Sequence, residues 1–323
     1  MRLSSIAAQG TWLPLAFLAV ATAWPWFGEL AMQGIGVWAF LIVGCGVLAM
    51  SPGRLDRADL GPTLYLAVGA SLLAPALAFG CTLLLPVSPE LRLVMLVLAA
   101  APIAQAAGPL AAILGLPDRA ATLAALATVL LAPLVLPAVA ALFTAAGPGL
   151  SAEGLIWRVL VVALLPALLA FAARRFAAAP VAVWRLECRG IVILALSMVA
   201  AARGPGMHML VDAPLDAAWM AGLACLVTLC GMAAAGFLTA PFGLRCCLAA
   251  TYAGGTRNIS VAWTALAPLL DADGMLFVTM MVFPFYLLPI VMRPLARRLL
   301  AASPPTPVGH AGPAFAALRG AAP

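Results

Sequence analysis

The sequence predicts an all-α polytopic membrane protein, and three observations lead to that prediction. Hydrophobic residues make up 65% of the 323-residue chain and charged residues only 9%, and the mean hydropathy is +1.13. Apolar runs of about 20 residues, the length that crosses a bilayer as a helix, recur along the chain. The basic residues, all of them arginine, lie mostly between these runs and form no dense patch of the kind that binds nucleic acid. A soluble domain with a single core is therefore excluded.

Charges or Pro and Gly residues separate ten such runs, and each run is predicted to be one transmembrane helix. In chain order the predicted spans are 11–28, 33–50, 62–86, 91–115, 119–146, 155–173, 190–206, 217–239, 244–270 and 274–299. Residues 1–300 would then form a single transmembrane unit. Residues 301–323, in which Pro, Gly and Ala are frequent, are expected to be a disordered cytoplasmic tail.

The arginines predict the orientation of these helices. If the N-terminus is cytoplasmic, Arg92, Arg158 and Arg203 face outward, Arg257 lies within a span, and the remaining thirteen of the 17 basic residues face the cytoplasm. An excess of arginine on one side marks that side as cytoplasmic. We therefore expect a multi-pass protein of a bacterial inner membrane with both termini in the cytoplasm. Arg203 is expected in a solvated external loop that also contains Asp212 and Asp216.

Ten helices divide into two halves of five, and an odd number per half gives the halves opposite orientations. Pro14 and Pro166 begin similar segments in the two halves. The fourth and ninth spans, one in each half, are both interrupted in the middle by small residues. A pair of interrupted helices is typical of a transporter with its binding site near the bilayer midplane. The residues predicted to form the helix crossing are Gly108, Pro109, Gly254 and Gly255.

The ninth span also carries polar residues in its interrupted centre. Each of the two glycines weakens a helix by about 1 kcal/mol relative to alanine, and Arg257 at the midplane costs roughly 2.5–3.5 kcal/mol on insertion scales. Half-helix N-termini and an arginine together favour an anion. Two interpretations of Arg257 remain open: it binds the substrate, or its donors cap the carbonyls of the half-helices. The residues predicted to bind substrate are Arg257, Asn258, Gln105 and Thr256. Aromatic residues of the same region are expected to pack rather than to bind: Tyr252, Trp263, Phe283 and Tyr286.

Three segments, 101–108, 128–137 and 254–258, read Ala-Pro-Ile-Ala-Gln-Ala-Ala-Gly, Thr-Val-Leu-Leu-Ala-Pro-Leu-Val-Leu-Pro and Gly-Gly-Thr-Arg-Asn. Over about residues 10–300, and most of all in these segments, the chain resembles the bile acid:sodium symporter family, part of a larger group with arsenite exporters and auxin carriers. The resemblance implies a panel domain of helices 1, 2, 6 and 7 and a core domain of helices 3–5 and 8–10. It also implies that helices four and nine cross, and that sodium drives transport.

The chain departs from that family at the positions where the resemblance implies sodium ligands. The family's glutamate and glutamine in the ninth span align with Ala253 and Arg257, and its serine and asparagine in the fourth span align with Ala107 and Gly108. Hydroxyl groups remain in the fifth span at Thr122 and Thr128, but one or two uncharged oxygens beside a guanidinium make a poor sodium site. Gln105 aligns with a threonine that contacts substrate in the family, and Asn258 matches directly.

The predicted function is a secondary transporter of a small organic anion, working by alternating access and independent of sodium or coupled differently. An arsenite-type efflux carrier is an alternative, although the cysteine that such carriers place in the fourth span is missing between Leu91 and Gly115. A membrane sensor that does not transport is a second alternative. An intramembrane enzyme is disfavoured because the spans hold no paired acid, base or nucleophile. No cofactor, metal or nucleic-acid partner is expected.

Overall fold

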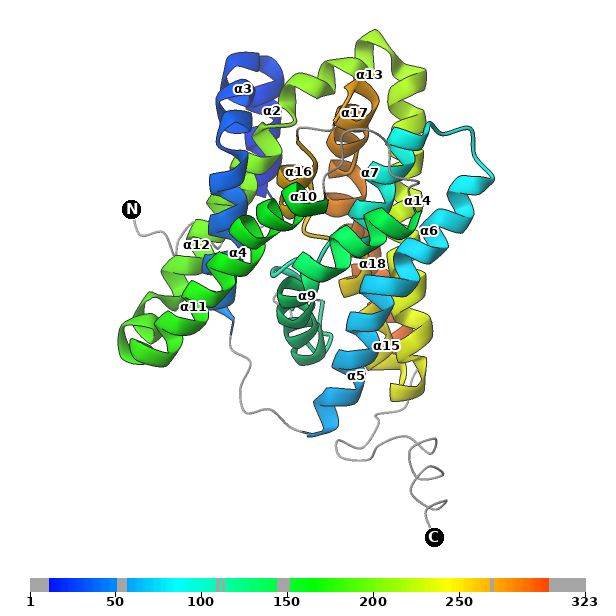
Figure 1. Cartoon of the computed structure of the whole chain (residues 1–323). Coiled ribbons are helices and arrows are strands. Elements are labelled where there is room, and N and C mark those ends of the chain that lie inside the picture. Colours follow the sequence, from blue (N-terminus) through cyan, green and yellow to red (C-terminus); the bar gives the residue numbers. More distant parts are fainter. Residues whose placement is uncertain are drawn as a thin grey trace.

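The computed structural model describes residues 12–50, 57–108, 111, 114–143, 152–267 and 270–301, and its regular elements are helices (Figure 1). Five of them are long and apolar enough to cross a membrane, or up to seven if each of two sharply bent pairs is one span. The expectation of an all-α polytopic membrane protein is thus confirmed. The expected tail lies outside the described residues, apart from Ala301 at its start.

The N-terminal region departs from the predicted first span, 11–28. Helix α2 (Trp12–Ala23) stops early, and α3 (Pro25–Gln33) leaves at a bend of 118°. Trp24 between them has φ −128° and ψ 85°, because a residue that precedes proline is disfavoured in the helical region. Helix α4 (Ile35–Ala49) then follows close to the second predicted span.

Two of the long helices contain a turn of π-helix. In the first, α5 (Arg57–Val68), η1 (Gly69–Leu73) and α6 (Ala74–Leu83) are continuous. In the second, α10 (Ala152–Val159), η2 (Leu160–Leu164) and α11 (Leu165–Phe176) are continuous. A π-turn shifts the backbone bonding from i→i+4 to i→i+5 and is frequent at functional sites. In chain order, two helices follow the first long helix and precede the second: α7 (Pro89–Ala100), which Ser88 caps, and α9 (Arg119–Phe143).

The seventh predicted span, 190–206, overlaps a bent helix pair, Glu187–Ala201 and Gly204–Asp212, that is apolar enough to cross a membrane, but its helix begins earlier than the predicted span. Helix α12 (Ala178–Ala201) begins directly after α11, with only Ala177 between them. Arg185 and Arg189 therefore lie on the helix and not in a loop. The two arginines suggested a break, but arginine is a good helix former.

The C-terminal half begins with η3 (Gly204–His208) and α13 (Met209–Asp212). Next come α14 (Pro214–Thr239), η4 (Ala240–Phe242) and α15 (Leu244–Gly255). The last elements are α16 (Ile259–Leu266), α17 (Ala272–Met280) and α18 (Val282–Ala301). Gly243 makes the turn between η4 and α15. Its φ of 93° is a backbone conformation that residues with a Cβ rarely adopt.

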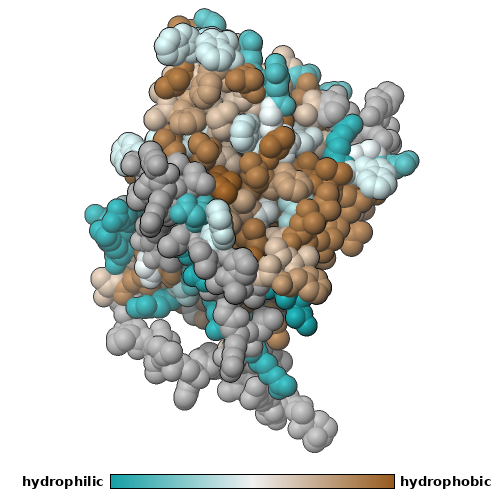
Figure 2. All heavy atoms as spheres, turned by 90° about the vertical axis from the view of Figure 1, so that its left-hand side faces the viewer, coloured by the Kyte–Doolittle hydropathy of each residue, from teal (hydrophilic) through white to brown (hydrophobic). Residues whose placement is uncertain are grey.

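The helices pack in two groups with the interrupted segments between them. Helix α12 contacts α2 and α4, and α11 contacts α4, whereas α14 contacts α5, α6, α15 and α17. Helices α9 and α16 lie between the groups (Figure 1) and contact η2 and α4 of the first group. On the face formed by the first group, apolar residues gather in the upper part and at the right of the view, and hydrophilic residues lie along the upper edge, at the left and in the lower part (Figure 2).

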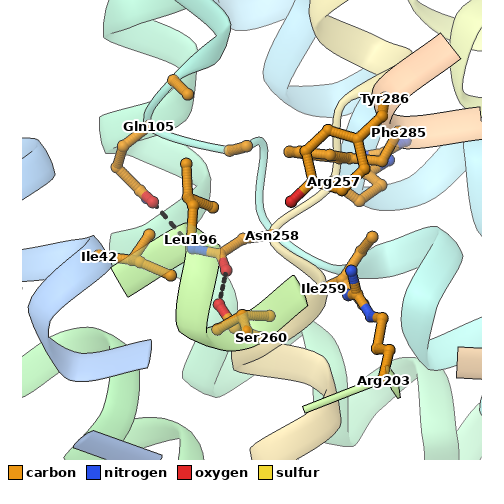
Figure 3. Close-up of a pocket in the computed structure, with 13 residues that line it drawn as sticks. Ile42, Gln105, Leu196, Arg203, Arg257, Asn258, Ile259, Ser260, Phe285 and Tyr286 are labelled. Atoms are coloured by element: carbon orange, nitrogen blue, oxygen red, sulfur yellow. Dashed lines mark hydrogen bonds between the residues drawn. The ribbon is translucent and has the colours of Figure 1, made fainter. Parts of the chain in front are cut away.

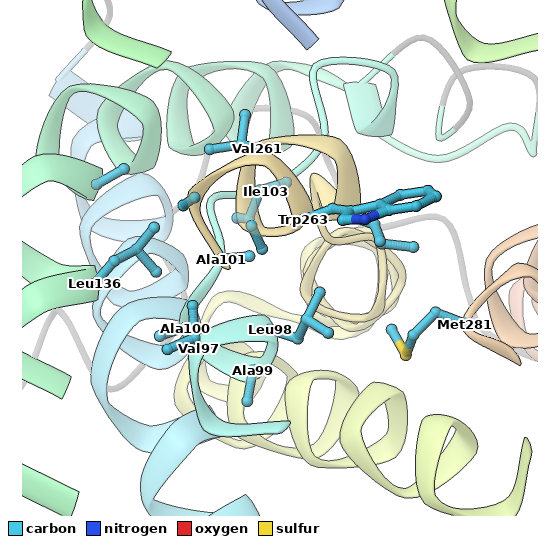
Figure 4. Packing of buried hydrophobic residues seen from close by; sticks show 14 of the residues in the cluster. Val97, Leu98, Ala99, Ala100, Ala101, Ile103, Leu136, Val261, Trp263 and Met281 are labelled. Carbon is cyan, nitrogen blue, oxygen red and sulfur yellow. The ribbon is translucent and has the colours of Figure 1, made fainter. Parts of the chain in front are cut away.

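Buried apolar side chains surround the place where the interrupted helices meet. Residues 97–101 at the end of α7 pack with Ile103, and Val261 and Trp263 of α16 lie above them (Figure 4). Leu98, Ile103 and Val261 are fully buried. This close packing holds the backbone of the interrupted segments in place where it is not helical.

Candidate functional site

The two interrupted segments pair with each other through their backbones. Ile103 and Arg257 form an isolated antiparallel β-bridge. On one side of it the Ala104 N–H donates to the Thr256 carbonyl at 2.9 Å, and on the other the Asn258 N–H donates to the Pro102 carbonyl at 2.8 Å. Each break therefore satisfies backbone groups that the other leaves free, which backbone inside a membrane protein must achieve without water.

The ninth span breaks where the sequence predicts, since α15 ends at Gly255 and α16 begins at Ile259. The fourth span breaks earlier than predicted. Helix α7 already ends at Ala100, and Ala101, with φ −53° and ψ 146°, has left the helical region. Pro102 explains this, because it restricts the residue before it and has no N–H to continue a helix.

Gly108 has a different role from the one predicted for it. It is helical and buried, and a Cβ at this position would overlap the Thr122 hydroxyl of α9. A glycine here therefore allows close approach between chain segments rather than a break. Pro109, also predicted at the crossing, lies outside the described residues.

Thr128 of α9 holds the break of the fourth span in place. Its hydroxyl accepts a hydrogen bond from the Ile103 N–H at 3.1 Å and donates to the Ala124 carbonyl at 2.8 Å. Both Thr128 and Ile103 are buried. The Thr128 hydroxyl, one of the two considered above as sodium ligands, is thus already hydrogen-bonded to the backbone of Ile103 and Ala124.

Arg257 lies buried at the crossing, with 1% of its surface exposed. Its Nη1 donates to the Ala101 carbonyl at the end of α7, at 3.3 Å, and to the Ala70 carbonyl in η1, at 3.2 Å. Nη2 lies against Gly231 of α14, where a Cβ would be only 2.9 Å away. Nε and Nη2 have no hydrogen-bond partner. The bond to Ala101 is the one expected of a residue that caps a half-helix, whereas the bond to Ala70 joins Arg257 to the π-turn of a continuous helix.

Asn258 joins three elements of the crossing (Figure 3). Its Nδ2 donates to Gln105 Oε1 at 2.8 Å. Its Oδ1 accepts from the Ser260 hydroxyl at 2.7 Å and from the Val261 N–H at 3.3 Å, so Asn258 is also the N-cap of α16. Gln105 Nε2 remains buried without a partner. The sequence predicted Gln105 and Asn258 as binding residues, and the structure brings them together. The sequence did not point to Ser260, because a single small hydroxyl in an apolar run is inconspicuous.

Thr256, which was also predicted to bind substrate, contributes its backbone carbonyl to the crossing, but its hydroxyl is used elsewhere. Its hydroxyl donates to the Ala253 carbonyl at 2.9 Å and so caps the end of α15. It does not line the cavity described next.

A cavity of about 20 Å³ lies between the crossing and helices α4, α12 and α18. A volume of this size holds about one water molecule, so an organic anion would need the cavity to enlarge. Its lining comes from α4 and α12 of the first group, from α18, which contacts α14 and α15 of the second group, and from the crossing itself: Ile42, Ala104, Gln105, Ala106, Leu196, Val199, Arg203, Arg257, Asn258, Ile259, Ser260, Phe285 and Tyr286.

Arg203 corrects an expectation from the sequence. It was placed in a solvated loop with Asp212 and Asp216, and although both acids are exposed, Arg203 is only 2% exposed and lines the cavity. The loop is drawn inward because Gly204 packs tightly on Ala21 of α2. The glycine after the arginine was the available signal, since it permits that close approach.

The guanidinium of Arg203 lies over the Trp263 ring, 5.7 Å from its centroid, within the range of a cation–π contact. In Figure 3 the Arg203 side chain extends toward the other pocket residues. Its Nε has no hydrogen-bond partner. Neither Arg203 nor Arg257 has a carboxylate partner in the part of the chain that the structure describes. Two unneutralised buried cations therefore lie at this site.

The remaining aromatic and cysteine residues divide between packing and the cavity. Trp263, Tyr252 and Phe283 pack as expected, whereas Tyr286 also lines the cavity. The seven cysteines are free, and none lines the cavity. Among the described residues no group of three or more His, Cys, Asp or Glu could hold a metal ion.

Comparisons with known proteins give no match: no family model matches the chain, and no curated protein matches it.

Proposed function

We propose that this chain is a secondary transporter of a bacterial inner membrane that carries a small organic anion by alternating access. One observation carries the proposal: two buried arginines, with no carboxylate partner among the described residues, line one cavity beside the paired breaks of the two interrupted helices. An uncompensated charge in a low-dielectric interior is expensive, and an intramembrane arginine is by default evidence of a functional site. An anion would neutralise this charge while bound.

The proposed architecture is ten helices in two inverted halves, with both termini cytoplasmic. The backbone bonds at the crossing support it, because they are reciprocal about the Ile103–Arg257 pair, as an approximate two-fold axis would require. The helix packing also supports a panel of α2, α4, α11 and α12 beside a core group around α14. Helices α7 and α15, too short to span alone at 12 residues each, would be half-helices.

Cysteine labelling tests this topology. Single cysteines replacing Asp273 and Pro304 should react with a membrane-impermeant maleimide from opposite sides of the membrane. Reaction from the same side would remove an odd number of helices between them and break the inverted repeat.

Alternating access is supported by the position of the cavity between the two helix groups. Helix α4 meets the crossing at Gly46, where a Cβ would lie 2.7 Å from the Cβ of Gln105. Movement of the panel helices away from the crossing would enlarge the cavity, and movement back would close it. Relative motion of two bundles around a fixed site is the usual form of alternating access.

Independence from sodium is part of the proposal. Arg257 donates to the Ala70 and Ala101 carbonyls, which gives these oxygens a fixed cation in place of a bound one. Thr128 is engaged by the backbone of Ile103. An arsenite-type carrier is less well supported because no cysteine lines the cavity.

The deciding experiment combines binding with transport. The purified protein is screened by thermal shift against a panel of organic anions and their neutral amides, and any stabilising anion is then tested as a labelled substrate in proteoliposomes. We expect stabilisation by at least one anion, together with uptake above protein-free liposomes. Binding without uptake would favour a sensor, and the absence of both across the panel would refute the proposal.

A further inference from the structure

The two buried arginines differ in how their side chains are used. Arg257 Nη1 bonds to the carbonyls of Ala70 and Ala101, and Nη2 lies beside Gly231. None of these three partners lines the cavity. The outer atoms of the Arg257 guanidinium are therefore directed into the packing of η1, α7 and α14.

Arg203 has no comparable backbone contacts for its side chain. Its neighbour is the Trp263 ring, over which the guanidinium lies. An aromatic ring covers the face of a guanidinium but leaves its in-plane N–H donors free to bond elsewhere. The Nε of Arg203 has no partner, and the residue lines the cavity while only 2% exposed. A buried, stacked guanidinium with free edge donors suits a planar carboxylate.

The other polar atoms of the cavity agree with an acceptor as the ligand. Gln105 Nε2 is a second buried donor without a partner. Among the residues that line the cavity, the buried side-chain atoms that lack partners are all nitrogen donors, from Gln105, Arg203 and Arg257. Buried donors without acceptors cost free energy that a ligand's oxygens would recover.

The walls of the cavity limit the rest of the ligand. Ile42 of α4 and Leu196 and Val199 of α12 give it an apolar side, and Phe285 adds an aromatic ring. A second carboxylate would meet these side chains, because Nη1 and Nη2 of Arg257 lie against Ala70, Ala101 and Gly231, none of which lines the cavity. Burying an unpaired charge against them is unfavourable.

We infer that Arg203 binds the carboxylate of the transported anion, and that this anion is a short aliphatic monocarboxylate whose chain lies against Ile42, Leu196 and Val199. The inference rests on the proposed function and adds to it the residue and the substrate class. It assigns Arg257 to the architecture of the crossing.

Butyrate, its neutral isostere butyramide and the dianion succinate test the inference, with binding measured by isothermal titration of the detergent-purified protein. The wild type should bind butyrate and reject the other two. Arg203→Gln should weaken butyrate binding roughly ten- to a hundredfold, the effect of losing a charge-assisted hydrogen bond. Arg158→Gln is the matched control: Arg158 is a partly buried arginine that bonds the Ala265 carbonyl at 3.2 Å and does not line the cavity. It should bind butyrate as the wild type does.

Arg203→Lys keeps the charge and loses the planar fork, so its butyrate affinity should fall between those of the wild type and Arg203→Gln. If Arg203→Gln does not fold, the lysine variant decides, and a wild-type affinity in it overturns the inference. Unchanged butyrate affinity in a folded Arg203→Gln protein also overturns it, as does equal binding of butyrate and butyramide by the wild type. Binding of succinate but not butyrate would refute this inference and leave the proposed function standing, whereas no binding of any anion would remove both.

Discussion

Gly231→Ala should destabilise the protein, because α14 and α15 touch through their backbones at this point. An ideal Cβ on Gly231 would overlap the Gly254 carbonyl oxygen and lie 2.9 Å from Arg257 Nη2 and 3.1 Å from the Gly254 carbonyl carbon. The nearest atom belongs to the backbone and not to a flexible side chain, so the helices themselves must separate. Small residues that let membrane helices approach this closely are a common form of packing.

The expected magnitude follows from two opposing effects. Replacing glycine by alanine inside a helix is favourable by about 1 kcal/mol, whereas overpacking a close-packed site costs about 1–3 kcal/mol and occasionally more. The rigid backbone contact places Gly231→Ala at the upper end of that cost, for a net loss of about 2 kcal/mol. Separation of the helices would also move Gly254, next to the crossing.

Gly222→Ala is the matched control on the same helix. Gly222 is exposed on the surface of α14, and a Cβ there would have no atom within 4 Å. Only the gain in helix propensity then applies, so stability should stay constant or rise. Melting temperatures of both variants, measured by fluorescence in the same detergent, would show the difference. Equal melting temperatures for the two variants would refute the close backbone contact between α14 and α15.

Three further predictions concern the crossing. Arg257→Gln should lower the melting temperature, because the Ala70 and Ala101 carbonyls lose the donor that they share. Each buried group left unsatisfied costs about 1–3 kcal/mol. An unchanged melting temperature together with lost anion binding would instead make Arg257 the recognition residue. Asn258→Ala should also lower the melting temperature, by about 1 kcal/mol for the lost N-cap at Val261 alone. Asn258→Ser, which keeps a neutral capping oxygen, should lower it less. Ligand affinity measured in sodium and in choline buffers should agree within a few-fold, and a steep dependence on sodium would reveal a cation site built from backbone oxygens.

The sequence predicted the class of fold because hydropathy and helix length are local properties. It also placed the break of the ninth span, where the two glycines lie within the helix that they weaken. It misplaced the break of the fourth span because Gly108 is an equally plausible breaker when read alone. The structure shows that Pro102 ends the helix and that Gly108 packs against Thr122. A glycine that bends a chain and a glycine that lets two segments touch look the same in a sequence.

Side-chain roles at the site were harder to predict than its location. Gln105 and Asn258 were identified because polar residues in apolar runs are conspicuous. Arg203 was not identified as a site residue, because a charged residue near the end of a span is ordinarily solvated. It is buried here because the neighbouring Gly204 packs tightly on Ala21. The guanidinium of Arg257 is directed by the Ala70 carbonyl, 187 residues away in sequence, and no local pattern contains that contact.

The pairing of Ile103 with Arg257 uses main-chain atoms alone. Such a joint is made without either side chain. Proline is excluded at positions 104 and 258, whose N–H groups donate across the joint, and at position 103, whose N–H donates to Thr128. Substitution of either residue can therefore change the chemistry of the crossing while the backbone joint stays in place, and its cost comes from the packing of Ile103 and the hydrogen bonds of Arg257. For the transporter proposed above, this means that a new coupling chemistry can arise by point substitution, without first having to evolve a new way of holding the broken helices together.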